Sequence, residues 1–261
     1  MSKNTEDART STEGSSFVEV TNPKHAVDLA TKQSYSENVF LFLPNIIGYM
    51  RVVLAAMALY YMSYHPKYCT VAYALSQLLD AADGYAARAL GQTSRFGAVL
   101  DMVVDRCTTS GLLVFLATAY PKWALFFQFL ISLDFASHYM HMYSSLLTGS
   151  KSHKNIQSDV SRILRFYYTN KNVLFAVCAG NEAFYLGLYL QKWVRGPLFL
   201  LPGLEWAGPW TWANLLTWVS CPIFIYKNVV NFVQLWKASK ILVGVDLADR
   251  AKERATAEKK T

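Results

Sequence analysis

The segment Asp80–Asp105, DAADGYAARALGQTSRFGAVLDMVVD, decides the interpretation of this chain because it places four carboxylates in an apolar setting. Its pattern is Asp-x-x-Asp-Gly-x-x-Ala-Arg, eight residues, and then Gly-x-x-x-Asp-x-x-x-Asp. Side chains three or four residues apart on an α-helix lie on the same face. Asp80 and Asp83 therefore share one face, and Asp101 and Asp105 share a face of the next helix.

Two such faces turned toward each other make a pocket of four carboxylates. One carboxylate near the middle of a membrane costs about 2.5–3.5 kcal/mol on insertion scales, so four unpaired ones would cost roughly 10 kcal/mol. Divalent cations are the simplest compensation. The alternative is a set of carboxylates at helix ends that face water, but it does not require glycines and an arginine at fixed offsets.

The composition indicates a membrane protein. Of the 261 residues, 53% are hydrophobic and only 16% are charged, and aromatic residues reach 15%. The net charge of +7 would suggest nucleic acid in a soluble protein. Here the basic residues lie in tails and loops, where they set membrane topology, so the bilayer and not nucleic acid is the expected partner.

The apolar segments predict an all-α integral membrane fold with six transmembrane helices. An amphipathic surface helix over Glu37–Leu43 is expected to precede them. The six expected spans are 46–64, 68–90, 96–120, 123–143, 172–193 and 207–226, the last continuing as a helix to Trp236.

The spans divide the chain into three parts. We expect a disordered polar extension over residues 1–35, a catalytic membrane domain over 36–236 and a charged tail over 237–261. Six spans place both termini on one side, and the basic tail assigns that side, with the 91–95 and 144–171 loops, to the cytosol. The two pairs of carboxylates flank the 91–95 loop and therefore face the cytosol.

The motif resembles the signature of the CDP-alcohol phosphotransferases. All eight fixed positions of that signature are present: Asp80, Asp83, Gly84, Ala87, Arg88, Gly97, Asp101 and Asp105. The resemblance implies a metal-dependent membrane enzyme that uses a CDP-linked lipid, with two Mg²⁺ or Mn²⁺ ions. It also implies a homodimer.

By the same resemblance, Asp80, Asp83, Asp101 and Asp105 form the metal site, and Asp105 is also the general base. Three further residues are expected to bind CDP-diacylglycerol: Gly84, Arg88 and Ser94. Gly84 would leave room for cytidine, and Arg88 would donate a forked pair of hydrogen bonds to the diphosphate. The alternative role for Arg88 is only to extend its side chain so that the charge lies in the water at the membrane interface.

Longer stretches resemble the eukaryotic branch of this family that makes phosphatidylinositol at the endoplasmic reticulum. They include 37–51, 79–106, 132–141, 152–154, 165–168 and 178–182. The resemblance makes myo-inositol the expected acceptor, and its hydroxyls call for polar partners. The candidates are Asp134, His138, Lys154, Arg165, Asn181 and Glu182. Each has an alternative role, as a polar group satisfied inside the bundle, a helix brace or a loop charge.

Other functions remain open at this point. A sibling enzyme would use serine, glycerol 3-phosphate, choline or ethanolamine as acceptor. A cation transporter would also carry carboxylates in its membrane helices, but it would be expected to show repeated or broken helices in both halves. A purely structural scaffold would not need four clustered aspartates.

Overall fold

The computed structural model describes residues 27, 38–148, 167, 170–194 and 211–258. All regular structure within these residues is helical. Two compact units are distinguished, residues 1–42 and 43–261. The six long helices all belong to the second unit, and they occur where the sequence places the six expected spans.

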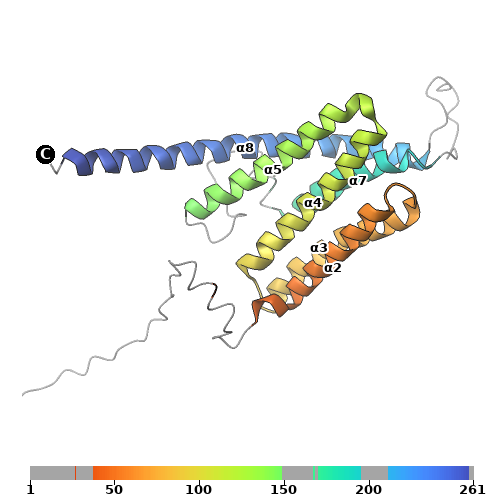
Figure 1. The fold of residues 1–261 in the computed structure, drawn as a ribbon, viewed down its shortest axis with the longest axis horizontal. Helices are drawn as coiled ribbons and strands as arrows, with labels where there is room; N and C mark the ends of the chain where they lie inside the picture. Colours follow the sequence, from red (N-terminus) through yellow and green to blue (C-terminus); the bar gives the residue numbers. More distant parts are fainter. Residues whose placement is uncertain (1–26, 28–37, 149–166, 168–169, 195–210, 259–261) are drawn as a thin grey trace, which may run out of the picture. The chain divides into compact units, whose positions relative to one another are not determined.

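The successive long helices of the second unit run in alternating directions (Figure 1). Their bounds are α2 Leu43–Tyr61, α3 Pro66–Ala89, α4 Arg95–Ala119, the short 3₁₀-helix η2 Pro121–Trp123, α5 Ala124–Leu147, α7 Lys171–Leu190 and α8 Trp212–Glu258. Helix α2 packs along α3 and against α4, while α8 packs against α5 and α7. Helix α4 contacts α2, α5 and α7, and so joins the two groups.

Local sequence signals set the ends of the helices. Pro66 occupies the first turn of α3, where its missing N–H is no loss. Gly91 follows the end of α3 with a φ of 64°, a left-handed conformation that glycine adopts without strain. The Asn170 side chain accepts a hydrogen bond from the Asn172 backbone N–H and caps α7.

The expected surface helix over Glu37–Leu43 is not formed in the part that the structure describes. Val39–Leu41 form a three-residue 3₁₀-helix, η1, in the first unit, and Phe42 is extended with a ψ of 137°.

An apolar core closes one end of the bundle. Leu112 and Leu116 of α4 and Tyr73 of α3 are buried there against Tyr189 of α7. The Tyr189 hydroxyl donates to the Met62 carbonyl, 2.9 Å away. This closed end leaves the C-terminal part of α3 and the N-terminal part of α4 to form the other, polar end.

By length and apolar composition, two of the described helices can cross a membrane, Leu43–Tyr61 and Asn172–Leu190. Helices α3 and α4 carry the charged side chains of the motif. The expectation of six spans therefore remains a prediction. Helix α8 has 47 residues and is about 70 Å long at 1.5 Å per residue, more than twice the roughly 30 Å of a bilayer core.

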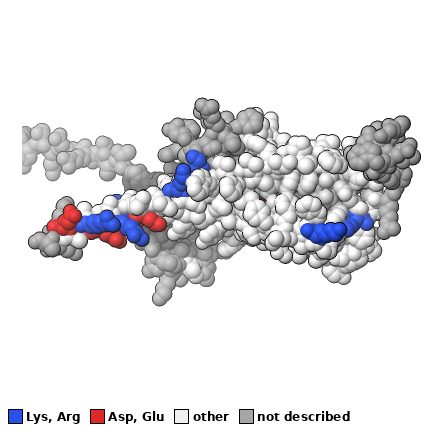
Figure 2. Space-filling model, turned by 90° about the horizontal axis from the view of Figure 1, so that it is seen from above, with Lys and Arg blue, Asp and Glu red and all other residues white. Residues whose placement is uncertain are grey.

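The surface of the described part agrees with an apolar environment for most of the bundle. On the face shown in Figure 2, charged side chains gather over the C-terminal part of α8, and most of the remaining described surface carries no charge. Helix α8 continues unbroken past residue 236, where the sequence places the start of the tail. Most of the expected loop over 144–171 and the segment 195–206 lie outside the described residues, and α5 continues into the start of that loop as far as Leu147.

Candidate active site

The structure brings the two halves of the motif together at the polar end of the bundle. Asp80 and Asp83 lie in the C-terminal half of α3, and Asp101 and Asp105 lie in the first turns of α4. Asp80, Asp101 and Asp105 each offer an oxygen, and these oxygens lie within 4.8 Å of one another. The face-to-face arrangement expected from the helical spacing is therefore present.

Arg51 of α2 lies at the centre of the four carboxylates. Its Nη1 is 2.7 Å from Asp83 Oδ2 and 2.6 Å from Asp101 Oδ1. Its Nη2 is 2.9 Å from Asp80 Oδ1 and also contacts Asp105 Oδ1. The arginine itself is only 1% exposed. A single guanidinium thus contacts all four aspartates.

The charges of this cluster do not balance. Four ionised carboxylates around one guanidinium leave a net charge of −3. The side chains of Asp80, Asp101 and Asp105 are 35%, 38% and 26% exposed, so further cations can reach them. Carboxylate oxygens are the ligands that Mg²⁺ and Mn²⁺ prefer. The residues present therefore fit a site for divalent cations.

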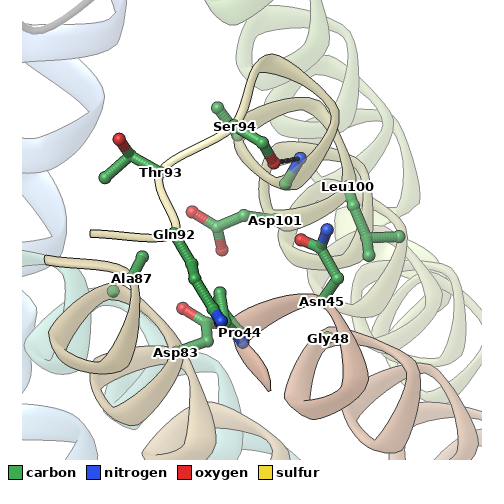
Figure 3. A pocket seen from close by; sticks show the side chains of 13 residues that line it. Pro44, Asn45, Gly48, Asp83, Ala87, Gln92, Thr93, Ser94, Leu100 and Asp101 are labelled. Carbon is green, nitrogen blue, oxygen red and sulfur yellow. Dashed lines mark hydrogen bonds between the residues drawn. The ribbon is translucent and has the colours of Figure 1, made fainter. Parts of the chain in front are cut away.

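A cavity of about 140 Å³ lies beside the cluster. Figure 3 shows Asp83 from α3, Asp101 from α4 and Asn45 from α2 around it, with the loop of Gln92 and Thr93 along one edge. The Gln92 side chain accepts a hydrogen bond from the Leu43 backbone N–H, 3.0 Å away, and ties this loop to the start of α2.

Gly84 lines the cavity, and no backbone atom from a neighbouring element crowds it. A Cβ built at residue 84 would meet only the guanidinium of Arg88, with Nη1 at 3.3 Å. Arg88 therefore lies over Gly84 at the edge of the motif. This placement is consistent with both roles expected from the resemblance. Gly84 leaves room for a ligand, and the guanidinium of Arg88 lies beside that space.

Ser94 and Gly97 shape the start of α4. The Ser94 hydroxyl caps the helix by accepting from the Gly97 backbone N–H at 2.9 Å (Figure 3). A Cβ at residue 97 would meet Asn45 Oδ1 at 2.6 Å, so a glycine is needed for the close approach of α2 and α4. Ser94 lines the cavity as well, but its hydroxyl already has this structural role.

A second group of buried polar side chains lies between α4, α5 and α8. Arg106 Nη1 is 3.0 Å from Asp134 Oδ1 and 3.0 Å from His138 Nε2. Asn231 Nδ2 donates to the same Asp134 oxygen at 3.0 Å, and Lys227 Nζ donates to Asn231 Oδ1 at 2.5 Å. Arg106 Nη2 also lies 3.6 Å from Asp105 Oδ2, and so joins this group to the motif.

Glu182 of α7 completes the buried polar group. It accepts hydrogen bonds from the Tyr73 hydroxyl at 2.5 Å and from Thr109 Oγ1 at 2.9 Å. A cavity of about 20 Å³ adjoins it, with room for about one water molecule, and the buried Asn181 Oδ1 beside it has no hydrogen-bond partner among the described residues.

The residues considered for inositol binding thus divide into two sets. Asp134, His138, Asn181 and Glu182 are hydrogen-bonded inside the bundle, which is the alternative role of a polar group satisfied there. Lys154 and Arg165 lie outside the described residues.

Sequence reasoning missed Arg106, Lys227 and Asn231. The signal was present, because Lys227 and Asn231 are polar residues four positions apart in a mostly apolar segment. Arg51 lies inside the expected 46–64 span, and nothing in the sequence indicated that it would contact all four aspartates.

Comparison with known proteins identifies the family. The family model of the CDP-alcohol phosphatidyltransferases matches residues 41–186, more than half of the chain. The chain belongs to this family. None of the solved structures matches it.

Curated relatives are similar over nearly their whole length. The chain is 49% identical to a CDP-diacylglycerol–inositol 3-phosphatidyltransferase of Schizosaccharomyces pombe, over 82% of this chain and 93% of the relative. It is 48% identical to the human protein of the same name, over 84% and 99%. The Saccharomyces cerevisiae protein of that name is 46% identical, over 84% and 93%.

Proposed function

We propose that this protein transfers the phosphatidyl group of CDP-diacylglycerol to myo-inositol, giving phosphatidylinositol and CMP. The observation that carries the proposal is the cluster of four aspartates around Arg51 beside an open cavity. The reaction type follows from the family, and the acceptor follows from relatives named for inositol transfer at 46–49% identity.

Asp80, Asp83, Asp101 and Asp105 hold two divalent cations, Mg²⁺ or Mn²⁺, in this proposal. The excess negative charge of the cluster and the 4.8 Å spread of three of its oxygens support it. The bound cations would supply positive charge to the diphosphate of the substrate and to the leaving CMP.

Asp105 is the general base of the proposed reaction. It takes the proton from one inositol hydroxyl, and the resulting alkoxide attacks the phosphorus next to the diacylglycerol. A new P–O bond to inositol forms as the P–O bond to CMP breaks, and Asp105 then passes its proton to solvent. Arg106 Nη2 lies 3.6 Å from the second oxygen of Asp105.

The cavity of about 140 Å³ receives the nucleotide end of the lipid substrate. Gly84 leaves space on its wall, and Arg88 donates to the diphosphate from the adjacent turn. Ser94 contributes its hydroxyl while it caps α4, since a hydroxyl oxygen that accepts one hydrogen bond can still donate another.

The setting of the enzyme follows from the same family. We infer six membrane spans over residues 36–236, a homodimer, and a location in the endoplasmic reticulum membrane with both termini and the active site on the cytosolic side. The extension over 1–35 and the tail over 237–261 lie outside the catalytic part. The basic residues of the tail support the orientation.

A transfer assay on the purified full-length protein in detergent tests the proposal. CDP-diacylglycerol and Mg²⁺ are supplied with labelled inositol, serine or glycerol 3-phosphate in parallel, with and without a chelator. Label should enter lipid from inositol alone, and the chelator should abolish it. Label from another alcohol would keep the site but overturn the acceptor. The absence of any transfer in protein that binds CDP-diacylglycerol would overturn the proposed reaction.

A further inference from the structure

The contacts of Arg51 have a definite stoichiometry. A guanidinium has five N–H donors in a rigid planar fork, four of them on the two terminal nitrogens. Those two nitrogens contact four carboxylates, two each. The remaining donor, on Nε, is buried and has no hydrogen-bond partner among the described residues. The terminal donors of Arg51 are thus matched in number to the four aspartates.

The pairing within these contacts crosses between helices. Nη1 joins Asp83 of α3 to Asp101 of α4, and Nη2 joins Asp80 of α3 to Asp105 of α4. Each terminal nitrogen thereby links one half of the motif to the other. The Arg51 backbone carbonyl accepts from Ser76 Oγ at 3.3 Å, a contact that joins α2 to α3 one turn before Asp80.

Each contact engages one oxygen of its carboxylate. A carboxylate has two oxygens and about four lone-pair directions, so a contact with Arg51 does not use up its capacity to bind a cation. Without a central cation, four carboxylates at this separation would repel one another and turn apart. Arg51 therefore brings them together while leaving the cluster with a charge of −3.

We propose that Arg51 is a positioning residue of the metal centre, whose fork sorts the four aspartates into the pairs Asp80/Asp105 and Asp83/Asp101. The inference rests on the proposed role of these aspartates as metal ligands. A lysine at residue 51 would supply the same charge from a single point and could not hold two separate pairs. Charge alone is therefore insufficient, and the shape of the guanidinium is what the site requires.

Equilibrium binding of Mn²⁺ tests this inference without reference to turnover. The full-length protein in detergent is titrated and free Mn²⁺ is followed by electron paramagnetic resonance, for the wild type and for Arg51→Lys and Arg51→Met. Both variants should bind Mn²⁺ about tenfold to a hundredfold more weakly, the range seen when groups that orient metal ligands are lost. Arg51→Met should bind weakly even though its cluster is more negative.

Lys227→Met provides the matched control. Lys227 is also a buried cation, 4% exposed, but it bonds to Asn231 and not to the motif aspartates. Its loss should lower thermal stability and leave the affinity for Mn²⁺ as in the wild type. If Arg51→Met does not purify as a folded protein, the comparison of Mn²⁺ affinity between Arg51→Lys and the wild type remains, because the lysine keeps the buried positive charge.

Three results would overturn the inference. Wild-type affinity in Arg51→Lys would mean that charge alone is sufficient. Equal or tighter binding in Arg51→Met would mean that Arg51 only competes with metal for the oxygens. An absence of Mn²⁺ binding in the wild type would instead refute the proposed metal centre, and the inference with it.

Discussion

Two buried arginines of this bundle lie in opposite electrostatic surroundings. Arg51 faces four carboxylates, three of which are more than a quarter exposed, and leaves them with a charge of −3. Arg106 belongs to a buried group that holds two cations, Arg106 and Lys227, and two carboxylates, Asp134 and Glu182, around one small cavity. Arg106 also lies 3.6 Å from Asp105 and so links the two groups. The balanced group is typical of a structural network, while the unbalanced one has the excess negative charge that a site for external cations needs.

The difference predicts which property each group controls. Removing a carboxylate from the unbalanced cluster relieves repulsion and should cost function more than stability. Removing a carboxylate from the balanced group leaves an unpaired buried charge and should cost stability first. Three substitutions test this division and a fourth tests the cavity beside the cluster, and they follow from the largest expected effect to the smallest.

Asp105→Asn removes the proposed base and keeps the shape of the side chain. Turnover should fall by about 10²–10⁴-fold, the usual contribution of a positioned base, while CDP-diacylglycerol still binds. Initial rates of inositol transfer and equilibrium binding of the nucleotide lipid measure the two effects. Wild-type turnover in this variant would reject the assignment of the base.

Asp134→Asn breaks the balanced group. Arg106 then loses its main carboxylate partner inside the bundle, and the expected loss is about 3–5 kcal/mol of stability. Thermal unfolding in detergent measures it. A melting temperature equal to that of the wild type would show that the group does not stabilise the bundle.

Gly84→Leu fills part of the cavity wall, where the leucine side chain would occupy space that the nucleotide needs. Affinity for the nucleotide lipid, measured by equilibrium binding, should fall by about tenfold or more, which corresponds to about 1.4 kcal/mol or more of binding free energy. Gly84→Ala is the matched control, because its Cβ would meet only the flexible Arg88 side chain at 3.3 Å. Equal affinity in the leucine and alanine variants would contradict a steric role for Gly84.

Asp101→Asn should have the smallest effect on stability. In the presence of a chelator it removes one of four repelling charges and leaves Arg51 with three carboxylates. The variant should be as stable as the wild type or more stable by about 1 kcal/mol, the size of one charge interaction near 4 Å in a highly polar medium. Thermal unfolding measures the difference. A loss as large as that of Asp134→Asn would show that the cluster is structural.

The sequence predicted the positions of the six long helices and the carboxylate pocket. It could do so because helical periodicity fixes which residues share a face, as for Asp80 with Asp83 and Asp101 with Asp105. It did not predict that Arg51, in a different helix, would bridge both pairs. That contact depends on how α2 packs against α3 and α4, and local spacing carries no information about it.

The buried group around Arg106 was predicted only in part, for a related reason. Asp134, His138 and Glu182 were candidates for the acceptor site, but the packing that places them beside Arg106, Lys227 and Asn231 joins four segments that are far apart in the chain. In place of the expected surface helix before α2, the described residues form only the three-residue 3₁₀-helix η1 Val39–Leu41.

The central claim is that the unbalanced cluster binds metal and the balanced group does not. The most direct measurement is the shift in melting temperature caused by Mg²⁺ for the wild type, Asp101→Asn and Asp134→Asn. A ligand that binds the folded state at about a hundred times its Kd adds roughly 2.7 kcal/mol of stability. The account predicts that Mg²⁺ clearly raises the melting temperature of the wild type and that most of this increase is lost in Asp101→Asn. In Asp134→Asn the melting temperature without Mg²⁺ should be lower, but Mg²⁺ should raise it by as much as in the wild type. No rise in the wild type, or an equal rise in Asp101→Asn, would contradict it.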